Sequence, residues 1–357
     1  MKLYVIQKKF QNPFDAFDEN QLVCNRFGLF SILTFLLMKA TFLSILFYIF
    51  IGSFSALAQP VKQHGALQVK GVQLSNAKGQ PVVLRGMSFG WHNFWPRFYN
   101  AGAVNWLVKD WKINVVRAAM GVEPKDGYLQ KRDWSTEKVK AVVDAAIKEG
   151  IYVIIDWHSH GIQLEAAKQF FTEMASTYGH HPNVIYEIFN EPDHQSWADI
   201  KAYSEEVIKT IRAIDKDNII LVGTPHWDQD VDVAADDPIK GYNNLMYTLH
   251  FYAATHKQSL RDKGTYALSK GLPLFISESA GMLHTGDGPL NEVEWQAWID
   301  WAEKAKVSWI TWSVSDKAET CSVLLPTAAS DGAWKDSDLK ESGLKTRAKL
   351  RKYNGKK

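Results

Sequence analysis

Two glutamates each end an apolar run that is otherwise poor in charge. Glu191 lies in Asn190-Glu191-Pro192, at the end of the run 184–192, and Glu278 lies in the run 273–280. Two carboxyl groups that face each other across a cleft are what glycoside hydrolysis requires. One protonates the leaving oxygen, and the other attacks or stabilises the anomeric carbon. For this chemistry, the elements that carry the two glutamates must bring them together.

Polar or aromatic residues also end or interrupt most of the other apolar runs. These residues are Arg85, Arg117, Asp156, Trp157, His158, His250, Phe251, Tyr252 and Trp312. Each alone is compatible with a hydrogen-bonded residue at the rim of a fold. Together they predict one polar site, in which neutral His158 and His250 could position hydroxyls and carboxylates.

The residue types support the two glutamates in different ways. Arg117 and Tyr252 could hold Glu278 as an anion by charge and hydrogen bonding. Asn190 could bind the sugar 2-hydroxyl, a contact that strengthens in the transition state. Trp312 offers a flat apolar face for sugar C–H groups. The sequence therefore predicts an acid and a nucleophile in distinct environments, as carboxyl groups with opposite roles need.

The runs that carry these residues have the pattern of strands buried on both faces, because they are apolar without alternation. Eight are expected, at 82–88, 114–120, 152–158, 184–192, 219–224, 246–252, 273–280 and 308–316. Amphipathic segments with helix-capping residues lie between them. The clearest are 135–150, 161–179, 196–216, 291–306 and 343–352. A hairpin is expected before them, with strands at 67–74 and 81–86 and a turn at 75–79.

Eight strand–helix units without a linker predict a single (β/α)8 TIM barrel of the α/β class, with a short N-terminal β-hairpin. A doubly wound open sheet is the alternative. That fold would carry a Gly-rich phosphate-binding turn after its first strand, and the sequence has none. In a barrel the active residues follow the carboxyl ends of the strands, so Glu191 and Glu278, from strands four and seven, would face each other across the barrel mouth.

The first 58 residues differ from the rest of the chain. Met38-Lys39, an apolar run at 41–54 and Ala56-Leu57-Ala58 have the order of a secretory signal peptide. We therefore expect a start at Met38, cleavage after Ala58, a catalytic domain over 59–357 and a secreted or periplasmic protein. A retained membrane anchor is the alternative, since the apolar stretch 27–57 exceeds the roughly 20 residues that span a bilayer.

Charge and cysteine usage exclude some functions for the body of the chain. The formal net charge is +2, and residues 59–357 carry 36 basic and 36 acidic residues. A neutral body argues against nucleic acid as a partner, which would need clustered excess Lys and Arg. Cys321 is the only cysteine after the leader, so we expect no internal disulfide and a structural thiol rather than a nucleophile.

Several segments resemble the family 5 glycoside hydrolases, and in particular their bacterial endoglucanases. The segment 184–192, Val-Ile-Tyr-Glu-Ile-Phe-Asn-Glu-Pro, is similar to the signature of that family, the retaining cellulases. Further segments match at 84–88, 116–120, 155–158, 249–253 and 312–317, so the resemblance extends over about residues 65 to 345. It implies a monomeric endo-β-1,4-glucanase without cofactor, metal or obligate protein partner. Such an enzyme hydrolyses internal bonds of cellulose or related β-glucan polysaccharides by double displacement.

The resemblance also assigns residues, position by position. Glu191 would be the acid/base and Glu278 the nucleophile, and Arg85 would orient the fourth strand and the surroundings of the acid. The −1 sugar would be lined by Arg117, His158, Asn190, His250 and Tyr252, with Trp312 stacked on it. Sugars further from the cleaved bond would contact Lys317 and Glu319, then Phe94 and Trp95 on the glycone side, and Trp227 on the leaving-group side.

Three positions depart from the family pattern. The nucleophile is followed by Ser279-Ala280-Gly281 instead of Trp-Gly. Gly90 stands where a His is common, with Trp91 and His92 near enough to compensate, and Gly121 replaces a Tyr after the second strand. These changes leave the catalytic groups in place and leave the preferred glucan open.

Other functions on the same fold remain as alternatives. A β-mannanase or a mixed-linkage glucanase would use the same two carboxyl groups, and a carbohydrate-binding barrel would be expected to have lost one of them. A metal-dependent hydrolase could use His158-Ser159-His160 together with Asp156 and His180-His181. However, the fifth strand ends without the histidine that such barrels carry there.

Overall fold

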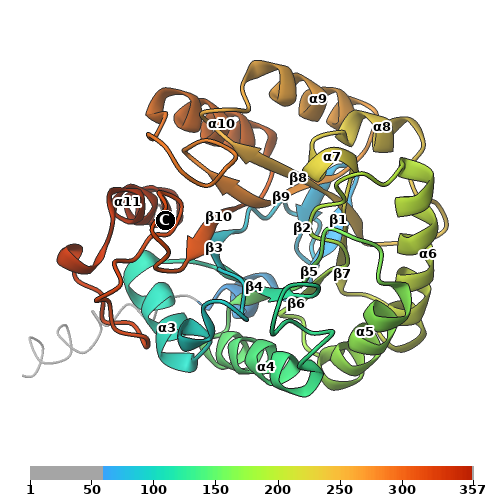
Figure 1. Cartoon of the computed structure of the whole chain (residues 1–357). Helices are drawn as coiled ribbons and strands as arrows, with labels where there is room; N and C mark the ends of the chain where they lie inside the picture. Colours follow the sequence, from blue (N-terminus) through green and yellow to red (C-terminus); the bar gives the residue numbers. More distant parts are fainter. Residues whose placement is uncertain (1–58, 356–357) are drawn as a thin grey trace, which may run out of the picture. The chain divides into compact units, whose positions relative to one another are not determined.

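The computed structural model describes residues 59–355. In this part of the chain, eight parallel strands close into a barrel in the order β10-β3-β4-β5-β6-β7-β8-β9 (Figure 1). The strands are β3 (Arg85–Phe89), β4 (Val115–Gly121), β5 (Tyr152–His158), β6 (Val184–Glu187), β7 (Ile219–Val222), β8 (Leu245–Tyr252), β9 (Leu274–Ala280) and β10 (Trp309–Val314). The predicted (β/α)8 barrel is confirmed.

Helices surround the barrel (Figure 1). The longer ones are α4 (Arg132–Glu149), α5 (Leu164–Tyr178), α6 (Trp197–Ile214), α9 (Gln258–Ser269), α10 (Glu292–Ala305) and α11 (Glu341–Asn354). Shorter ones are α2 (Pro60–His64), α3 (Ala101–Trp106), continued by a π-helical turn at Leu107–Trp111, α7 (Pro225–Asp228) and α8 (Val231–Asp236). Two 3-10 turns lie at Pro96–Phe98 and Asp336–Asp338. The five predicted helices are all present.

Helix boundaries follow the capping residues. The side chain of Ser196 accepts a hydrogen bond from the Asp199 N–H at the start of α6, and α4 ends at Gly150, whose φ of 71° lies in the left-handed region. In α10, Trp295 and Trp298 are fully buried and Trp301 packs against the same core. Tryptophans at helical spacing on this helix therefore belong to the core.

The hairpin differs from the prediction. Strands β1 (Gln68–Lys70) and β2 (Gln73–Ser75) are joined by a turn at Gly71, which adopts a φ of 59°. The predicted strand 67–74 is therefore two short strands. Residues 76–80 form a second turn, in which the Asn76 side chain accepts hydrogen bonds from the Lys78 and Gln80 N–H groups. The first barrel strand accordingly begins at Arg85, later than the predicted start at 82.

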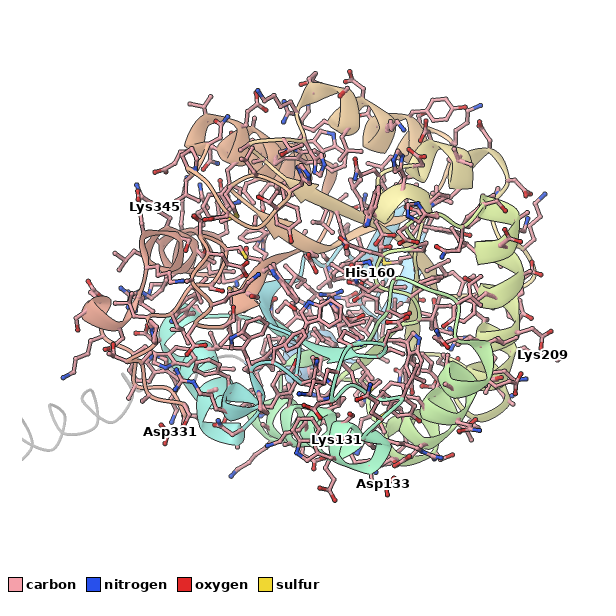
Figure 2. All side chains as sticks on the ribbon, viewed as in Figure 1. Lys131, Asp133, His160, Lys209, Asp331 and Lys345 are labelled. Atoms are coloured by element: carbon pink, nitrogen blue, oxygen red, sulfur yellow. The ribbon has the colours of Figure 1, made fainter. Side chains whose placement is uncertain are left out.

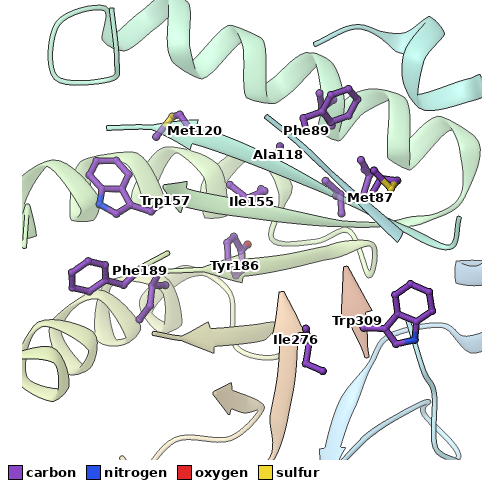
Figure 3. Close-up of a cluster of buried hydrophobic side chains, with 14 of the residues drawn as sticks. Met87, Phe89, Ala118, Met120, Ile155, Trp157, Tyr186, Phe189, Ile276 and Trp309 are labelled. Carbon is purple, nitrogen blue, oxygen red and sulfur yellow. The ribbon is translucent and has the colours of Figure 1, made fainter. Parts of the chain in front are cut away.

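The core lies between the strands and the helices. Figure 3 shows part of it, with Met87, Met120, Trp157 and Phe189 among the buried side chains. A second apolar cluster closes the amino end of the barrel, with Leu84, Val115, Ile154, Phe275 and Ile310. Charged side chains such as Lys131 and Lys209 lie at the periphery, whereas His160 lies over the barrel mouth (Figure 2). The packed interior leaves the loops at the carboxyl ends of the strands to form a site.

The predicted leader, with its start at Met38 and cleavage after Ala58, lies outside the described residues. Among residues 59–355, no helix has the length and apolar content needed to cross a membrane.

Candidate active site

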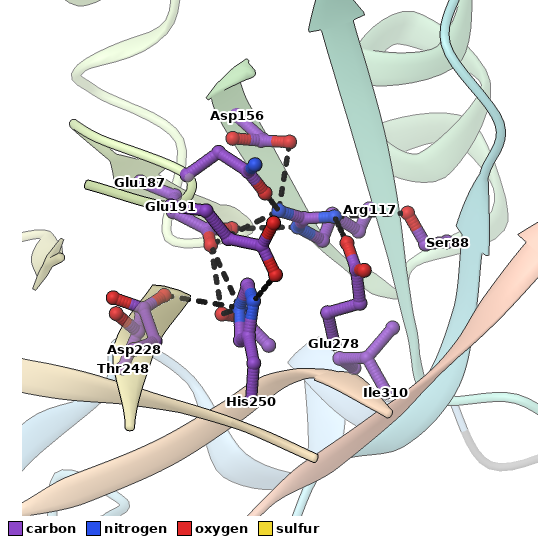
Figure 4. A network of polar contacts seen from close by, with 12 residues as sticks. Ser88, Arg117, Asp156, Glu187, Glu191, Asp228, Thr248, His250, Glu278 and Ile310 are labelled. Atoms are coloured by element: carbon purple, nitrogen blue, oxygen red, sulfur yellow. Dashed lines mark hydrogen bonds and ion pairs between the residues drawn. The ribbon is translucent and has the colours of Figure 1, made fainter. Parts of the chain in front are cut away.

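A fully buried arginine organises the carboxyl end of the barrel. On β4, Arg117 donates to Glu187 through Nε at 2.7 Å and Nη2 at 3.1 Å, and to Glu278 through Nη1 at 3.1 Å (Figure 4). Its Nη2 also contacts Asp156 at 2.9 Å and the Asn190 Oδ1 at 2.6 Å. One guanidinium therefore fixes groups from β5, β6, β9 and the loop after β6. Burial opposes ionisation of Glu187, but Arg117 and His250 together outweigh it and lower the Glu187 pKa to about 2.

Glu278 is held from both sides. One carboxylate oxygen contacts Arg117, and the other accepts a hydrogen bond of 2.6 Å from the Tyr252 hydroxyl at the end of β8. Both contacts were predicted, but their net effect was not. Burial and the Glu191 carboxylate raise the pKa of Glu278, and His250, Arg117 and Tyr252 only partly offset this. Glu278 is thus fixed in position without being made a stronger acid.

Glu191 follows β6 and remains partly open, with a side chain 14% exposed. Its Oε1 lies 2.8 Å from the Nδ1 of His250, and its oxygens approach those of Glu278 so that ligand atoms of all three residues lie within 4.8 Å of one another. The two glutamates therefore face each other across a short gap, as the strand order predicts.

Three acidic groups surround His250 and favour its cationic form. Burial alone would lower its pKa, but the carboxylates of Asp228, Glu187 and Glu191 outweigh burial and raise it well above the ordinary value. The sequence predicted a neutral ring, and two of these acids, Asp228 and Glu187, were not assigned to the site.

Three aromatic rings form one wall of the site. Trp312 stacks parallel to His158 with centroids 5.1 Å apart, and Trp91 meets the His158 ring edge-on at 4.2 Å. The Nδ1 of His158 lies 2.7 Å from Asp156. Burial lowers the pKa of His158 well below its usual value, so this ring is neutral. Trp91 occupies the space above Gly121, since a Cβ on that glycine would lie 2.7 Å from the indole.

A cavity of about 470 Å³ opens beside Glu191. It is lined by Glu191, His226, Trp227, Tyr252, His256 and His284, among others. Trp227 is 36% exposed and presents its indole at this cavity. The predicted aromatic residue after the fifth strand thus lies near Glu191, in a cavity that Trp312 does not line.

Comparison with known proteins agrees with this geometry. The family described as "Cellulase (glycosyl hydrolase family 5)" matches residues 75–318. The chain belongs to glycosyl hydrolase family 5. An endoglucanase of Clostridium saccharobutylicum is 42% identical over 300 residues, which are 82% of this chain and 66% of that protein. Endoglucanase Z of Dickeya dadantii is 45% identical over 274 residues, covering 75% of this chain and 62% of that protein. The chain thus spans about two thirds of the length of these relatives.

Solved structures share the fold of this chain. A structure from Cytophaga hutchinsonii has a TM-score of 0.82 and 47% identity, and covers 83% of this chain and 98% of that one. The catalytic domain of Thermobifida fusca endoglucanase Cel5A, solved in complex with cellotetraose, has a TM-score of 0.78 and 35% identity. It covers 82% of this chain and 100% of that one.

The glycone-side residues that the family 5 resemblance implies, Lys317, Glu319, Phe94 and Trp95, form no hydrogen bond or ion pair with the two glutamates within residues 59–355. Lys317 forms an ion pair with Glu319, and the Nζ of Lys340 donates to the Glu319 carbonyl oxygen at 2.9 Å. Phe94 is 52% exposed, whereas Trp95 is half-buried and packs against the core. Only the first of this aromatic pair therefore projects freely.

Arg85 does not belong to the site. It is the first residue of β3, paired with Trp309 at the start of β10, so it lies at the amino end of the barrel. Its Nε and Nη2 bind both oxygens of Glu303 on α10 at 2.6 Å. The expectation that Arg85 orients the acid is wrong, because the strand begins at this residue instead of ending there.

Three buried polar residues of the site were not identified from the sequence: Glu187, Asp228 and Ser277. Glu187 is the last residue of β6. The predicted strand continued to residue 192, so Glu187 was expected in the middle of a strand and not at its end. A carboxylate within an apolar run was the available signal, since such a group is costly to bury unless it is paired. Among residues 59–355, the ligand atoms close enough to hold a metal ion belong to Glu191, His250 and Glu278, and not to the residues of the metal alternative, Asp156, His158, His160, His180 and His181.

Proposed function

We propose that this chain is a retaining endo-β-1,4-glucanase with Glu278 as nucleophile and Glu191 as acid/base. The observation that carries the proposal is the short gap between their carboxylates, within 4.8 Å at the nearest ligand atoms. Retaining glycosidases place these carboxyl groups about 5–5.5 Å apart, whereas inverting enzymes need about 6.5–9.5 Å to admit a water. The gap therefore supports direct attack by a carboxylate.

In the first step, a Glu278 oxygen bonds to the anomeric carbon while the glycosidic bond breaks. Arg117 and the Tyr252 hydroxyl hold the attacking carboxylate. Glu191 gives its proton to the departing sugar oxygen, so the leaving group departs as a neutral alcohol. The products are a glycosyl-enzyme on Glu278 and a shortened glucan with a new 4-hydroxyl.

In the second step, water attacks the same carbon from the side that the leaving group vacated. Glu191, now a carboxylate, takes a proton from this water, and Glu278 departs as a carboxylate. Two inversions give retention of configuration.

Asn190 supports the transition state of both steps. Its Oδ1 is fixed by Arg117 at 2.6 Å, while its buried Nδ2 has no hydrogen-bond partner within the described residues. A buried donor without a partner is costly, so it is available to the sugar 2-hydroxyl.

Substrate on both sides of the glutamates fits cleavage within a chain. Trp227 and the cavity beside Glu191 would receive leaving-group sugars, and Trp312, Lys317 and Glu319 would bind the glycone. The relatives are endoglucanases, and one holds cellotetraose, which supports a β-glucan substrate.

The order of residues in the leader supports export as a secreted or periplasmic protein, and we infer that the catalytic domain acts as a monomer.

The test is reducing-sugar release from carboxymethyl cellulose, mixed-linkage β-glucan and mannan, with EDTA and Glu278→Gln as controls. We expect activity on the glucans that survives EDTA and is lost in the variant. Activity on mannan alone would identify mannan, and not a β-glucan, as the substrate. Loss of activity with EDTA would favour a metal-dependent reaction. Inactivity on all three polysaccharides would favour a carbohydrate-binding barrel.

A further inference from the structure

Asp228 is a buried acid beside the site that no step above uses. It ends α7 and is 0% exposed. Its Oδ1 accepts a hydrogen bond of 2.5 Å from the Thr224 N–H, and its Oδ2 lies 3.3 Å from the Nε2 of His250 (Figure 4). Burial raises the pKa of this carboxyl, and His250 is the largest influence that opposes this. A buried carboxylate needs such a charged partner.

The backbone that carries Asp228 is strained. His226, Trp227 and Asp228 have φ values of 61°, 55° and 59°, all in the left-handed region. A non-glycine residue held there is strained and persists only where the surroundings impose it. The Trp227 N–H donates to the Pro192 carbonyl, next to Glu191, at 2.9 Å. One turn thus presents Trp227 to the cavity and directs Asp228 at His250.

The hydrogen bonds around His250 fix one of its protons. The Ser277 hydroxyl donates to Glu187 at 2.7 Å, so its oxygen accepts from the Nε2–H of His250 at 2.8 Å. Nε2 therefore carries a proton in either charge state of the ring. The open question is whether Nδ1, at 2.8 Å from the Oε1 of Glu191, carries one as well.

The two charge states of His250 send the proton of Glu191 to different places. If the ring is neutral, Nδ1 accepts the proton of Glu191 at Oε1, away from the substrate. If the ring is cationic, Nδ1–H occupies Oε1, and the proton of Glu191 must reside on Oε2. Only the second arrangement leaves the acid free to protonate a leaving oxygen.

We propose that Asp228 is a positioning residue that keeps His250 cationic and thereby directs the transferable proton of Glu191 to Oε2. This inference rests on the proposed function, in which Glu191 is the acid. The proton on Oε2 passes to the glycosidic oxygen, and His250 keeps both of its protons through the step.

The charges around His250 favour this state from several elements. Acidic groups come from β6 with Glu187, from α7 with Asp228 and from β9 with Glu278, and Glu191 adds its charge only after it has given up its proton. The opposing cation is Arg117 on β4, which binds Glu187 and Glu278. Burial lowers the pKa of His158 and, to about 4, that of His256, so these two rings are neutral near pH 7.

The first test is the pH profile of Asp228→Asn, which keeps the shape and removes the charge. Loss of a nearby anion disfavours the cationic ring, so the basic limb of kcat/KM on glucan should move to lower pH by about one unit. At the optimum, kcat/KM on glucan should fall by about 10- to 100-fold. With 2,4-dinitrophenyl cellobioside, whose leaving group needs no proton, kcat/KM should change by less than about twofold.

Asp230→Asn is the matched control. It removes the same charge two residues away, where the carboxylate binds Lys263 at 2.6 Å, and it should leave both profiles unchanged. An Asp228→Asn profile that coincides with the unmodified enzyme, or equal losses on glucan and aryl substrate, would overturn the inference.

The second test measures the protonation of the His250 ring directly and needs no substitution of Asp228. Nitrogen-15 NMR of the histidine rings, with the His250 signal assigned by its loss in His250→Gln, should show both ring nitrogens protonated at pH 7. A neutral His250 ring at this pH contradicts the inference.

The proposed function has its own test, because Glu191→Ala must spare the aryl substrate relative to glucan. If it does not, the role of Glu191 fails while the NMR result still decides the state of His250.

Discussion

Two arginines on neighbouring strands bind carboxylates in the same bidentate manner at opposite ends of the barrel. Arg85 at the amino end of β3 binds Glu303, and the two side chains are 15% and 22% exposed. Arg117 on β4 binds Glu187 with both side chains fully buried, and it also contacts Asp156 and Glu278. One pair joins a strand to a helix, and the other gathers acids into a site. Burial and the number of acids that share the guanidinium therefore distinguish the two arginines, whereas pair geometry does not.

The largest effect should come from removing the shared cation. Arg117→Met leaves three buried acids without their common partner, and breaking a buried pair costs about 3–5 kcal/mol. Glu278 also loses a fixed contact, so kcat/KM should fall by about 10³-fold. Denaturant unfolding and glucan hydrolysis measure the two effects. A stability loss no greater than that of Arg85→Met would contradict the comparison.

The pH dependence of stability should also distinguish the Arg117–Glu187 pair from the Arg85–Glu303 pair. The Glu187 pKa is lowered from 4.5 to about 2, so this carboxylate contributes stability that is present above pH 4.5 and is lost as the pH falls through 2. Glu187→Gln should therefore cost about 3 kcal/mol near neutral pH and progressively less toward pH 2. The measurement is the free energy of unfolding of both proteins across this range. Glu303→Gln at the amino end is the control, and a similar pH trend there would remove the distinction between the two ends.

The sequence predicted one end of the barrel better than the other. Apolar runs identified all eight strands. The polar groups at their ends predicted that Arg117, His158, His250, Tyr252 and both glutamates gather at one end of the barrel, where the structure places them. Arg85 was misplaced because residues 82–84 are as apolar as the strand that follows. Glu187, Asp228 and Ser277 were missed because their roles depend on burial and on partners distant in sequence. A carboxylate's position along the chain does not show which cation it will share.

The rim of the carboxyl end should tolerate change better than the Arg117 cluster. A Cβ at Gly121 would lie 2.4 Å from the Asn93 Oδ1 and 2.7 Å from the Trp91 ring, both of them side chains that can move. Gly121→Ala should therefore cost about 1–3 kcal/mol by overpacking. Because Trp91 also contacts His158, displacement of the Trp91 ring should raise the KM for glucan. In a Trp91→Leu background the cost of Gly121→Ala should shrink, and equal costs in both backgrounds would show that Trp91 is not the obstacle.

The smallest effect should come from Arg85→Met. Glu303 keeps a hydrogen bond of 2.9 Å from the Trp309 indole and remains partly open to water, so it is not left as an unpaired buried charge. We expect a stability loss of about 1 kcal/mol or less. Glucan kcat/KM should stay within about twofold, since the altered side chain lies at the end of the barrel opposite Glu191. If Arg85→Met lowered activity as strongly as Arg117→Met, then a change at the amino end of β3 would affect Glu191 at the opposite end of the barrel. The contrast between a structural and a functional arginine would not hold.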